Sequence, residues 1–336
     1  MTSACILGCA GSRLSAEERA LFGRIEPFGL ILFARNVEDP GQVRALVDDF
    51  RAIVRRANAP VLIDQEGGRV QRLRPPHWRD FPAAARFGDL YSQDRTRGLA
   101  AARLGGQLIA AELVALEINV DCLPVADVRW PEGHAVIGDR AYGSEPSVVA
   151  ELARVAADGL LAGGVLPVVK HIPGHGRARV DSHESLPIVD ASLNELDRTD
   201  FEPFRRMADL PIAMTAHVIY SAIDPARPAT ISPVVIGEVI RKRIGFAGLL
   251  FTDDLSMKAL SGTLGWRTEA ALSAGCDVAL HCNGRIDEML EVAAASPRLG
   301  GEGARRAEAA LGRLGSPMEP LNVAEASARF SAMIAA

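Results

Sequence analysis

The segment 170–183 carries the densest set of chemically useful side chains in the sequence. Its fourteen residues, KHIPGHGRARVDSH, include three histidines, one aspartate, one lysine and two arginines. Ionisable groups are costly to bury without partners, so this composition is typical of a loop over a reaction site or of a solvated surface loop. Gly174 and Gly176 interrupt the segment, and we expect them to act as hinges for the residues that follow.

Asp181 and His183 are two residues apart, so both side chains point to the same side of an extended backbone. A carboxylate that accepts from one imidazole nitrogen fixes the tautomer and raises the basicity of the other nitrogen. His183 is then a candidate general acid and base. A second interpretation is a turn in which Asp181 bonds the backbone and His183 is solvated.

Asp253 follows the apolar run 249–252, which places its carboxylate at the end of an expected strand. A carboxylate in that position can attack an anomeric carbon and form a covalent glycosyl-enzyme, or can stabilise developing positive charge. The neighbouring Asp254 is better suited to be the N-cap of a helix that would begin at 255.

Further candidate binding residues follow apolar runs or lie in glycine-bounded loops. Asp64, with Arg69 and Arg72 beyond it, is suited to recognition of hydroxyl or carboxylate groups, or to a structural ion pair. Arg140 lies in the loop GDRAYG. Lys170 ends an expected strand, where its ammonium group could donate to substrate hydroxyl groups.

Zinc is an alternative use for the same histidines. His171, His175 and His183 with Asp181 are residue types that bind zinc. However, two arginines lie between them and would put positive charge where a cation would bind, so we expect no metal site.

Eight short apolar segments alternate with helical patterns along the chain. The expected strands are 4–7, 29–33, 59–63, 117–124, 165–169, 211–215, 246–251 and 276–280. This alternation indicates a parallel sheet, and the polar candidates recur just after strand ends. A single-domain (β/α)8 TIM-type barrel over residues 1–336, with catalytic loops at its C-terminal face and a helical tail at about 317–336, is therefore expected. An open doubly wound sheet is less favoured because no glycine-rich nucleotide-binding motif is present.

Composition limits the classes of partner. Aromatic residues make up 5% of the chain and the formal net charge is −5, which argues against a nucleic-acid partner. No apolar stretch approaches the length of a membrane span. The five cysteines lack metal-site spacing, so we expect reduced, buried thiols and a cytoplasmic location.

Several motifs, taken together and in order, resemble those of the glycoside hydrolase family 3 β-N-acetylglucosaminidases. They are GLILFARN at 29–36, DQEGGRVQR at 64–72, KHIPGHG at 170–176 with DSH at 181–183, MTAHV at 214–218 and FTDDLSM at 251–257. The resemblance implies a bacterial, cytoplasmic enzyme of peptidoglycan recycling, and we expect a monomer. Such enzymes remove terminal N-acetylglucosamine from anhydromuramyl peptides with retention of configuration, without a metal or an organic cofactor.

The resemblance also implies roles for individual residues. By position, Asp253 matches the nucleophile, His183 the acid/base and Asp181 its partner in a dyad. The positions that match the sugar-binding set are Asp64, Arg72, Arg140, Lys170 and His171. The chain departs from many relatives at Arg177, where they carry an acidic or small residue; this bears on the mobility of the loop and on its preference for the leaving group.

Three alternatives stay open beside a retaining hydrolase. They are a sugar-binding or regulatory protein without turnover, a β-N-acetylglucosaminide phosphorylase, and a metal-dependent hydrolase. A histidine acid/base tolerates an anionic phosphate acceptor better than a carboxylate does, which is the reason to consider phosphorolysis.

Overall fold

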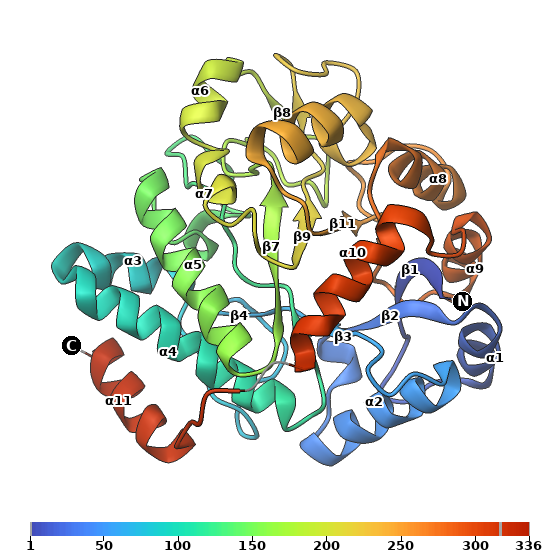
Figure 1. The fold of residues 1–336 in the computed structure, drawn as a ribbon, viewed down its shortest axis with the longest axis horizontal. Coiled ribbons are helices and arrows are strands. Elements are labelled where there is room, and N and C mark those ends of the chain that lie inside the picture. The colour runs from blue at the N-terminus through green and yellow to red at the C-terminus, as the bar shows by residue number, and fades with distance from the viewer. Residues whose placement is uncertain (1, 316–317, 336) are drawn as a thin grey trace.

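The computed structural model describes residues 2–315 and 318–335. Eight parallel strands close into a barrel in the order β1-β12-β11-β9-β7-β6-β3-β2, and helices surround it (Figure 1). The predicted single-domain (β/α)8 barrel is thus confirmed. The barrel strands are β1 (Ser3–Gly8), β2 (Pro27–Leu32), β3 (Val61–Ile63), β6 (Val120–Asp121), β7 (Leu166–Ile172), β9 (Ile212–Thr215), β11 (Leu249–Asp254) and β12 (Val278–His281).

The helices follow the strands and form the outer layer. The longer ones are α1 (Ala16–Ile25), α2 (Pro40–Val54), α3 (Ala84–Gln93), α4 (Arg95–Val114), α5 (Pro146–Ala162), α6 (Leu193–Arg198), the π-helix η4 (Val235–Ile244), α8 (Leu264–Ala274), α9 (Ile286–Ala295), α10 (Gly301–Gly312) and α11 (Val323–Ala335). The short ones are α7 (Glu202–Arg205), η1 (Ala34–Asn36), η2 (Gly138–Arg140), η3 (Ala229–Ile231) and η5 (Arg313–Gly315).

Local sequence signals set the ends of several helices. At the start of α1 the Ser15 hydroxyl accepts from the Glu18 N–H and the Glu18 carboxylate accepts from the Ser15 N–H, which forms a capping box. Gly163 ends α5. The Ser232 hydroxyl accepts from the Val235 N–H at 3.1 Å, so it caps the helical segment that contains η4.

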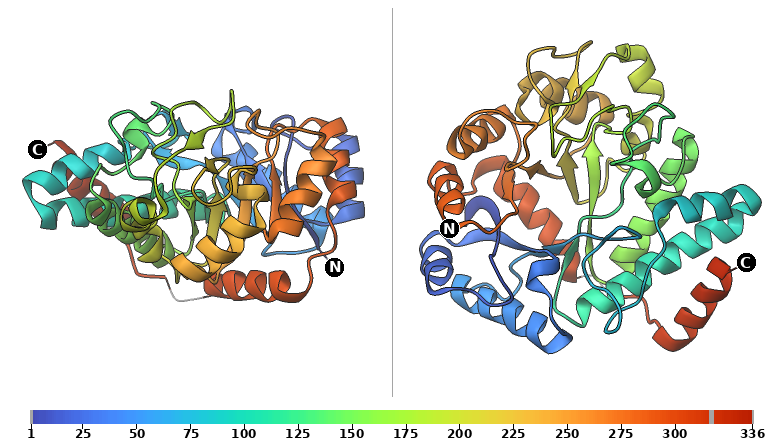
Figure 2. Two further views of the ribbon diagram at one scale, coloured as in Figure 1. Left: turned by 90° about the horizontal axis from the view of Figure 1, so that it is seen from above. Right: turned by 180° about the vertical axis from the view of Figure 1, so that it is seen from behind.

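Apolar side chains fill the inside of the barrel, and α10 covers its N-terminal end. The interior cluster includes Ile6, Phe28, Ile31, Leu62, Val168, Met214, Phe251 and Leu280. Ala307 and Ala310 of α10 belong to the same cluster, and Figures 1 and 2 show this helix crossing one end of the strands. The opposite end, where the strands' carboxyl termini lie, is the face at which (β/α)8 barrels carry their active sites.

The last described helix, α11, packs beside α4 (Figure 1). The Phe330 ring contacts the rings of Phe81 and Phe87. The two limits of the expected tail, residues 317 and 336, lie outside the described residues. Each helix within residues 2–315 and 318–335 is too short or too polar to span a lipid bilayer.

Several details differ from the sequence-based expectation. β6 covers two of the eight residues expected as a strand at 117–124, and β11 extends to Asp254, so Asp253 lies within this strand rather than after it. Strand β7 continues to Ile172, so Lys170 and His171 lie within it rather than after it. Two small sheets, β4 (Gln65–Gly67) with β5 (Val70–Gln71) and β8 (Ile188–Val189) with β10 (Ile219–Tyr220), lie outside the barrel. The helix N-cap at Asp254 was wrong: this residue ends β11, and its carboxylate accepts from the backbone N–H groups of Ser256 and Cys282.

Candidate active site

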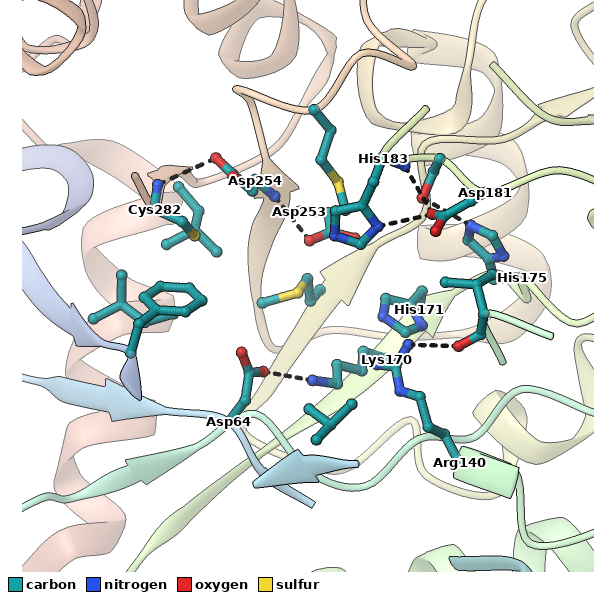
Figure 3. A pocket seen from close by; sticks show the side chains of 18 of the residues that line it. Asp64, Arg140, Lys170, His171, His175, Asp181, His183, Asp253, Asp254 and Cys282 are labelled. Carbon is teal, nitrogen blue, oxygen red and sulfur yellow. Dashed lines mark hydrogen bonds and ion pairs between the residues drawn. The ribbon is translucent and has the colours of Figure 1, made fainter. Parts of the chain in front are cut away.

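A cavity of about 460 Å³ opens at the carboxyl ends of the barrel strands (Figure 3). All of the site residues predicted from the sequence line it, although they come from distant parts of the chain: Asp64, Arg72, Arg140, Lys170, His171, Asp181, His183 and Asp253. The barrel therefore brings together in one cavity what the sequence separates by up to 189 positions, from residue 64 to residue 253.

Asp253 lies near the end of β11 and points into the cavity. One of its carboxylate oxygens accepts from the backbone N–H of Asp254 at 2.8 Å. Burial alone would raise the pKa of this carboxyl, but His171, His217 and Lys170, with that N–H, hold it below its usual value. Asp253 is therefore an ionised carboxylate at neutral pH, as a nucleophile must be.

Lys170 is the centre of a network of charges on the cavity floor. Its ammonium group lies 2.7 Å from a carboxylate oxygen of Asp64 and 2.7 Å from one of Glu66. Arg72 binds the second oxygen of Asp64 at 2.8 Å, and Arg140 forms a two-pronged ion pair with Glu66 at 2.8 Å for each contact. These cations outweigh the burial that would raise the pKa values of Asp64 and Glu66, and both pKa values are lowered.

His171 is oriented by a carboxylate below it. Its Nδ1 lies 2.7 Å from Asp127, which is fully buried and also accepts from the backbone N–H groups of His171 and His175. Burial would raise the pKa of Asp127, but His171, His175 and these N–H groups lower it. An ionised Asp127 can only accept, so Nδ1 is the donor and Nε2 is the nitrogen left for a substrate.

Asp181 and His183 lie on the loop that follows β7, which we call the arm (residues 174–185). The His183 Nδ1 lies 2.8 Å from Asp181 Oδ1, which also accepts from the His183 backbone N–H at 2.9 Å. The His183 side chain is 61% exposed, and Figure 3 shows the pair beside the cavity. The two features of the turn considered as an alternative are thus present, since Asp181 bonds the backbone and His183 is exposed. In addition, the imidazole and the carboxylate bond each other.

The two glycines of the arm have steric reasons to be there. Gly174 has a φ of +137°, and its carbonyl oxygen accepts from the buried Tyr220 hydroxyl. A Cβ on Gly176 would lie 1.8 Å from the carbonyl oxygen of Val128, so only glycine permits this approach of the two backbones. Gly176 is thus required by packing, and a role as a hinge is not needed to explain it.

Arg177 fastens the stem of the arm to two neighbouring segments. Its guanidinium stacks on the Trp130 ring at 3.5 Å from the ring centroid. It also bonds Asp200 and Glu195, each at 2.7 Å, and the Thr199 hydroxyl at 3.2 Å. Arg177 is therefore an anchor, which restrains the arm.

Two buried carboxylates of the site, Glu66 and Asp127, were missed from the sequence. Glu66 stands within the matched DQEGGRVQR motif, two residues after Asp64, and that spacing was the available signal. Asp127 follows the strand β6 in an apolar run without any signal of its own. Arg69, by contrast, pairs with Asp139 at the exposed rim, at 3.0 Å.

For the zinc alternative, residues 2–315 and 318–335 contain no group of three histidine, cysteine, aspartate or glutamate side chains placed to hold a metal ion. The expectation of no metal site stays a prediction. His171 and His183 each use Nδ1 for a carboxylate, and His175 Nε2 lies 3.2 Å from the Ser182 hydroxyl.

Comparison with known proteins agrees with this geometry. The family model for the glycosyl hydrolase family 3 N-terminal domain matches residues 7–305. Curated relatives named beta-hexosaminidase include one from Alkalilimnicola ehrlichii, 44% identical over 83% of this chain and 80% of the relative, and one from Pseudomonas aeruginosa, 40% identical over 88% and 86%.

Solved structures give the same result. NagZ from Neisseria gonorrhoeae, in complex with N-trifluoroacetyl-D-glucosamine, is 32% identical with a TM-score of 0.85 over 99% of this chain and 96% of that protein. A glycoside hydrolase family 3 β-N-acetylglucosaminidase from Paenibacillus is 29% identical with a TM-score of 0.88 over 98% of this chain, which spans 66% of that protein. The chain described here therefore belongs to glycosyl hydrolase family 3.

Proposed function

We propose that this glycoside hydrolase is a retaining exo-β-N-acetylglucosaminidase with Asp253 as nucleophile and the Asp181–His183 pair as acid/base. The observation that carries the proposal is that an ionised carboxylate at a rigid strand end and an aspartate-paired histidine line the same cavity. The names of the relatives support the reaction class, and the N-acylated glucosamine bound by the Neisseria enzyme supports the substrate class.

The reaction then runs in two steps. In the first step an Asp253 oxygen attacks the anomeric carbon and the bond to the leaving oxygen breaks, while His183 transfers its Nε2 proton to that oxygen. In the second step His183 removes a proton from water, and the resulting hydroxide displaces Asp253 from the sugar. Two inversions give net retention, and His183 ends as it began.

The floor network supports the sugar-binding part of the proposal. Lys170 has three N–H donors, and Asp64 and Glu66 take two of them, which leaves one for a sugar hydroxyl. Arg72, Arg140 and Asp64 are held by ion pairs on the same floor. His171 offers Nε2. Side chains fixed before binding lose little conformational entropy when the sugar arrives.

The natural substrate that we propose is an N-acetylglucosaminyl muropeptide, within cell-wall recycling in the cytoplasm, and the proposed state is a monomer. The motif resemblance supports the substrate. The five cysteines, all buried and unpaired, fit a reducing compartment. Product analysis on a muropeptide with a terminal N-acetylglucosamine tests the substrate, and light scattering tests the monomer.

Trapping of the intermediate tests the chemistry. A fluorinated N-acetylglucosaminide with a good leaving group should inactivate the enzyme, and peptide mass spectrometry should find the sugar on Asp253. NMR of the first product should show the β anomer. A label on another residue, or full activity in Asp253→Asn, would exclude this nucleophile. A sugar phosphate formed in phosphate buffer would show a phosphorylase instead.

A further inference from the structure

His175 is a buried histidine to which the reaction above gives no role. Only 2% of its surface is exposed, and its ring stands edge-on to His171 with the ring centroids 5.7 Å apart. Its backbone N–H donates to Asp127 at 2.6 Å, and its ring Nε2 lies 3.2 Å from the Ser182 hydroxyl. Burial, with the nearby His171, lowers the pKa of His175 to about 4, so the ring is neutral at neutral pH.

Ser182 is the point at which the tip of the arm contacts the barrel. It is 3% exposed, whereas the other residues of the run 179–185 are exposed or half-buried. Its carbonyl oxygen accepts from the backbone N–H of Ala259 at 3.1 Å, on the loop after β11. Ser182 lies between Asp181 and His183 in the sequence, so its position determines the backbone positions of both residues.

These contacts form a continuous path from the sugar-binding floor to the acid/base. It runs from His171 to the Asp127 carboxylate, from there to the backbone and ring of His175, and on to the Ser182 hydroxyl. Each step is a hydrogen bond or a covalent connection within one residue. If His175 only filled space in the core, it would be an unfavourable residue there, because its Nδ1 is buried with no hydrogen-bond partner in the described part of the chain.

We propose that His175 is a positioning residue: through its hydrogen bond to Ser182 it holds the tip of the arm where His183 can reach the leaving oxygen. This proposal rests on the acid/base role of His183. Because misplacement of a catalytic group by about 1 Å can reduce the rate roughly 100-fold, one hydrogen bond at the base of His183 is enough to matter.

The test compares substrates that do and do not need a proton. A 2,4-dinitrophenyl N-acetylglucosaminide has a leaving group that departs as a stable anion, whereas a phenyl or alkyl glycoside needs protonation. The value of kcat/KM reports the first step for both. The variants are Ser182→Ala, His175→Ala, His175→Gln and the double variant Ser182→Ala/His175→Ala. Val180→Ala, at an exposed position of the same arm, is the matched control.

For Ser182→Ala and His175→Ala we expect kcat/KM on the phenyl glycoside to fall about 10- to 100-fold, with less than about threefold loss on the dinitrophenyl glycoside. The double variant should lose no more than either single variant, since both remove the same bond. His175→Gln should recover part of the loss, because its amide can donate to Ser182. Val180→Ala should behave as the parent on both substrates.

Equal losses on both substrates would assign His175 a purely structural role and overturn the proposal, as would additive losses in the double variant. If the His175 variants do not fold, Ser182→Ala alone tests the proposal, because it removes the same hydrogen bond from the side of the arm and leaves His175 in place. His183→Ala separates the two hypotheses. If His183→Ala loses equally on the phenyl and dinitrophenyl glycosides, His183 is not the acid/base. If His183→Ala loses more on the phenyl glycoside but the Ser182 and His175 variants do not, only the role of His175 is wrong.

Discussion

Glu66 connects two cations of the cavity floor, Lys170 and Arg140, so Glu66→Gln should damage both stability and binding. The carboxylate takes one hydrogen bond from Lys170 at 2.7 Å and two from Arg140 at 2.8 Å, and only 7% of the residue is exposed. An amide has the same shape but no charge, and only its oxygen can accept. In the variant the amide oxygen keeps one of these contacts, Lys170 also keeps Asp64, and Arg140 also keeps its bond to the Val136 carbonyl oxygen at 3.2 Å.

The size of the effect follows from these contacts. A buried hydrogen bond to a charged group contributes about 1.5–3 kcal/mol, and leaving a buried charge without its partner costs about 3–5 kcal/mol. The amide oxygen retains one contact, so we expect a loss of about 3 kcal/mol. With about 2.1 cal/mol/K of unfolding entropy per residue over 336 residues, this lowers Tm by roughly 4 °C.

Calorimetry and steady-state kinetics measure the two consequences. If Lys170 and Arg140 bind the sugar, their displacement should raise KM about tenfold, which corresponds to about 1.4 kcal/mol, with a smaller change in kcat. Asp139→Asn is the matched control, because its pair with Arg69 is about half exposed and should contribute less than about 1 kcal/mol. A Glu66→Gln variant with parental Tm and KM would refute the view that the floor is one coupled network.

Three further variants test other groups. Arg177→Ala leaves the buried Asp200 without its cation, so we expect a Tm lower by a few degrees and faster proteolysis of the arm. Arg177→Lys should restore part of both losses. An unchanged cleavage rate would contradict the role of Arg177 as an anchor. His171→Gln removes the largest influence that lowers the pKa of Asp253, so the acid limb of the kcat/KM profile should move to higher pH, and a shift to lower pH would be evidence against it. Burial raises the pKa of Glu112 from 4.5 to about 7, so the native state loses stability as pH rises between these values. Glu112→Gln should therefore stabilise the protein by about 1–2 kcal/mol in urea unfolding at pH 8 and by little at pH 4.5, after allowance for partial exposure.

The fold was predictable because its signals are local. Apolar runs mark buried strands, and the cap at Ser15 and the glycine at Gly163 mark helix ends within a few residues. The prediction failed at Asp254, where a helix cap and a turn have the same local signature. Its carboxylate instead bonds the backbone of Cys282, 28 residues away on the adjacent strand's exit, and that contact exists only in the closed barrel.

The site shows the same division between local and distant contacts. The spacing of Asp181 and His183 predicts their contact, because the two residues are neighbours along one backbone. The partners of Glu66 and Asp127 lie at least 74 and 44 residues away, and hydrophobic periodicity carries no information over such separations. Residue type and spacing proposed the chemistry of Asp253 and His183, and the family resemblance proposed the sugar-binding set, whereas the contacts of Glu66 and Asp127 required the structure.

The closure of the barrel also determines when the site can exist during folding. β1 pairs with β12, so Cys5 lies opposite Ala279 at nearly the full length of the chain, and β12 pairs with β11, the strand of Asp253. Contacts between such distant segments form slowly, because the chain must first lose the entropy of a very long loop. We therefore expect the pocket to be assembled late in folding, and the recovery of enzymatic activity after dilution from denaturant should report the rate of barrel closure.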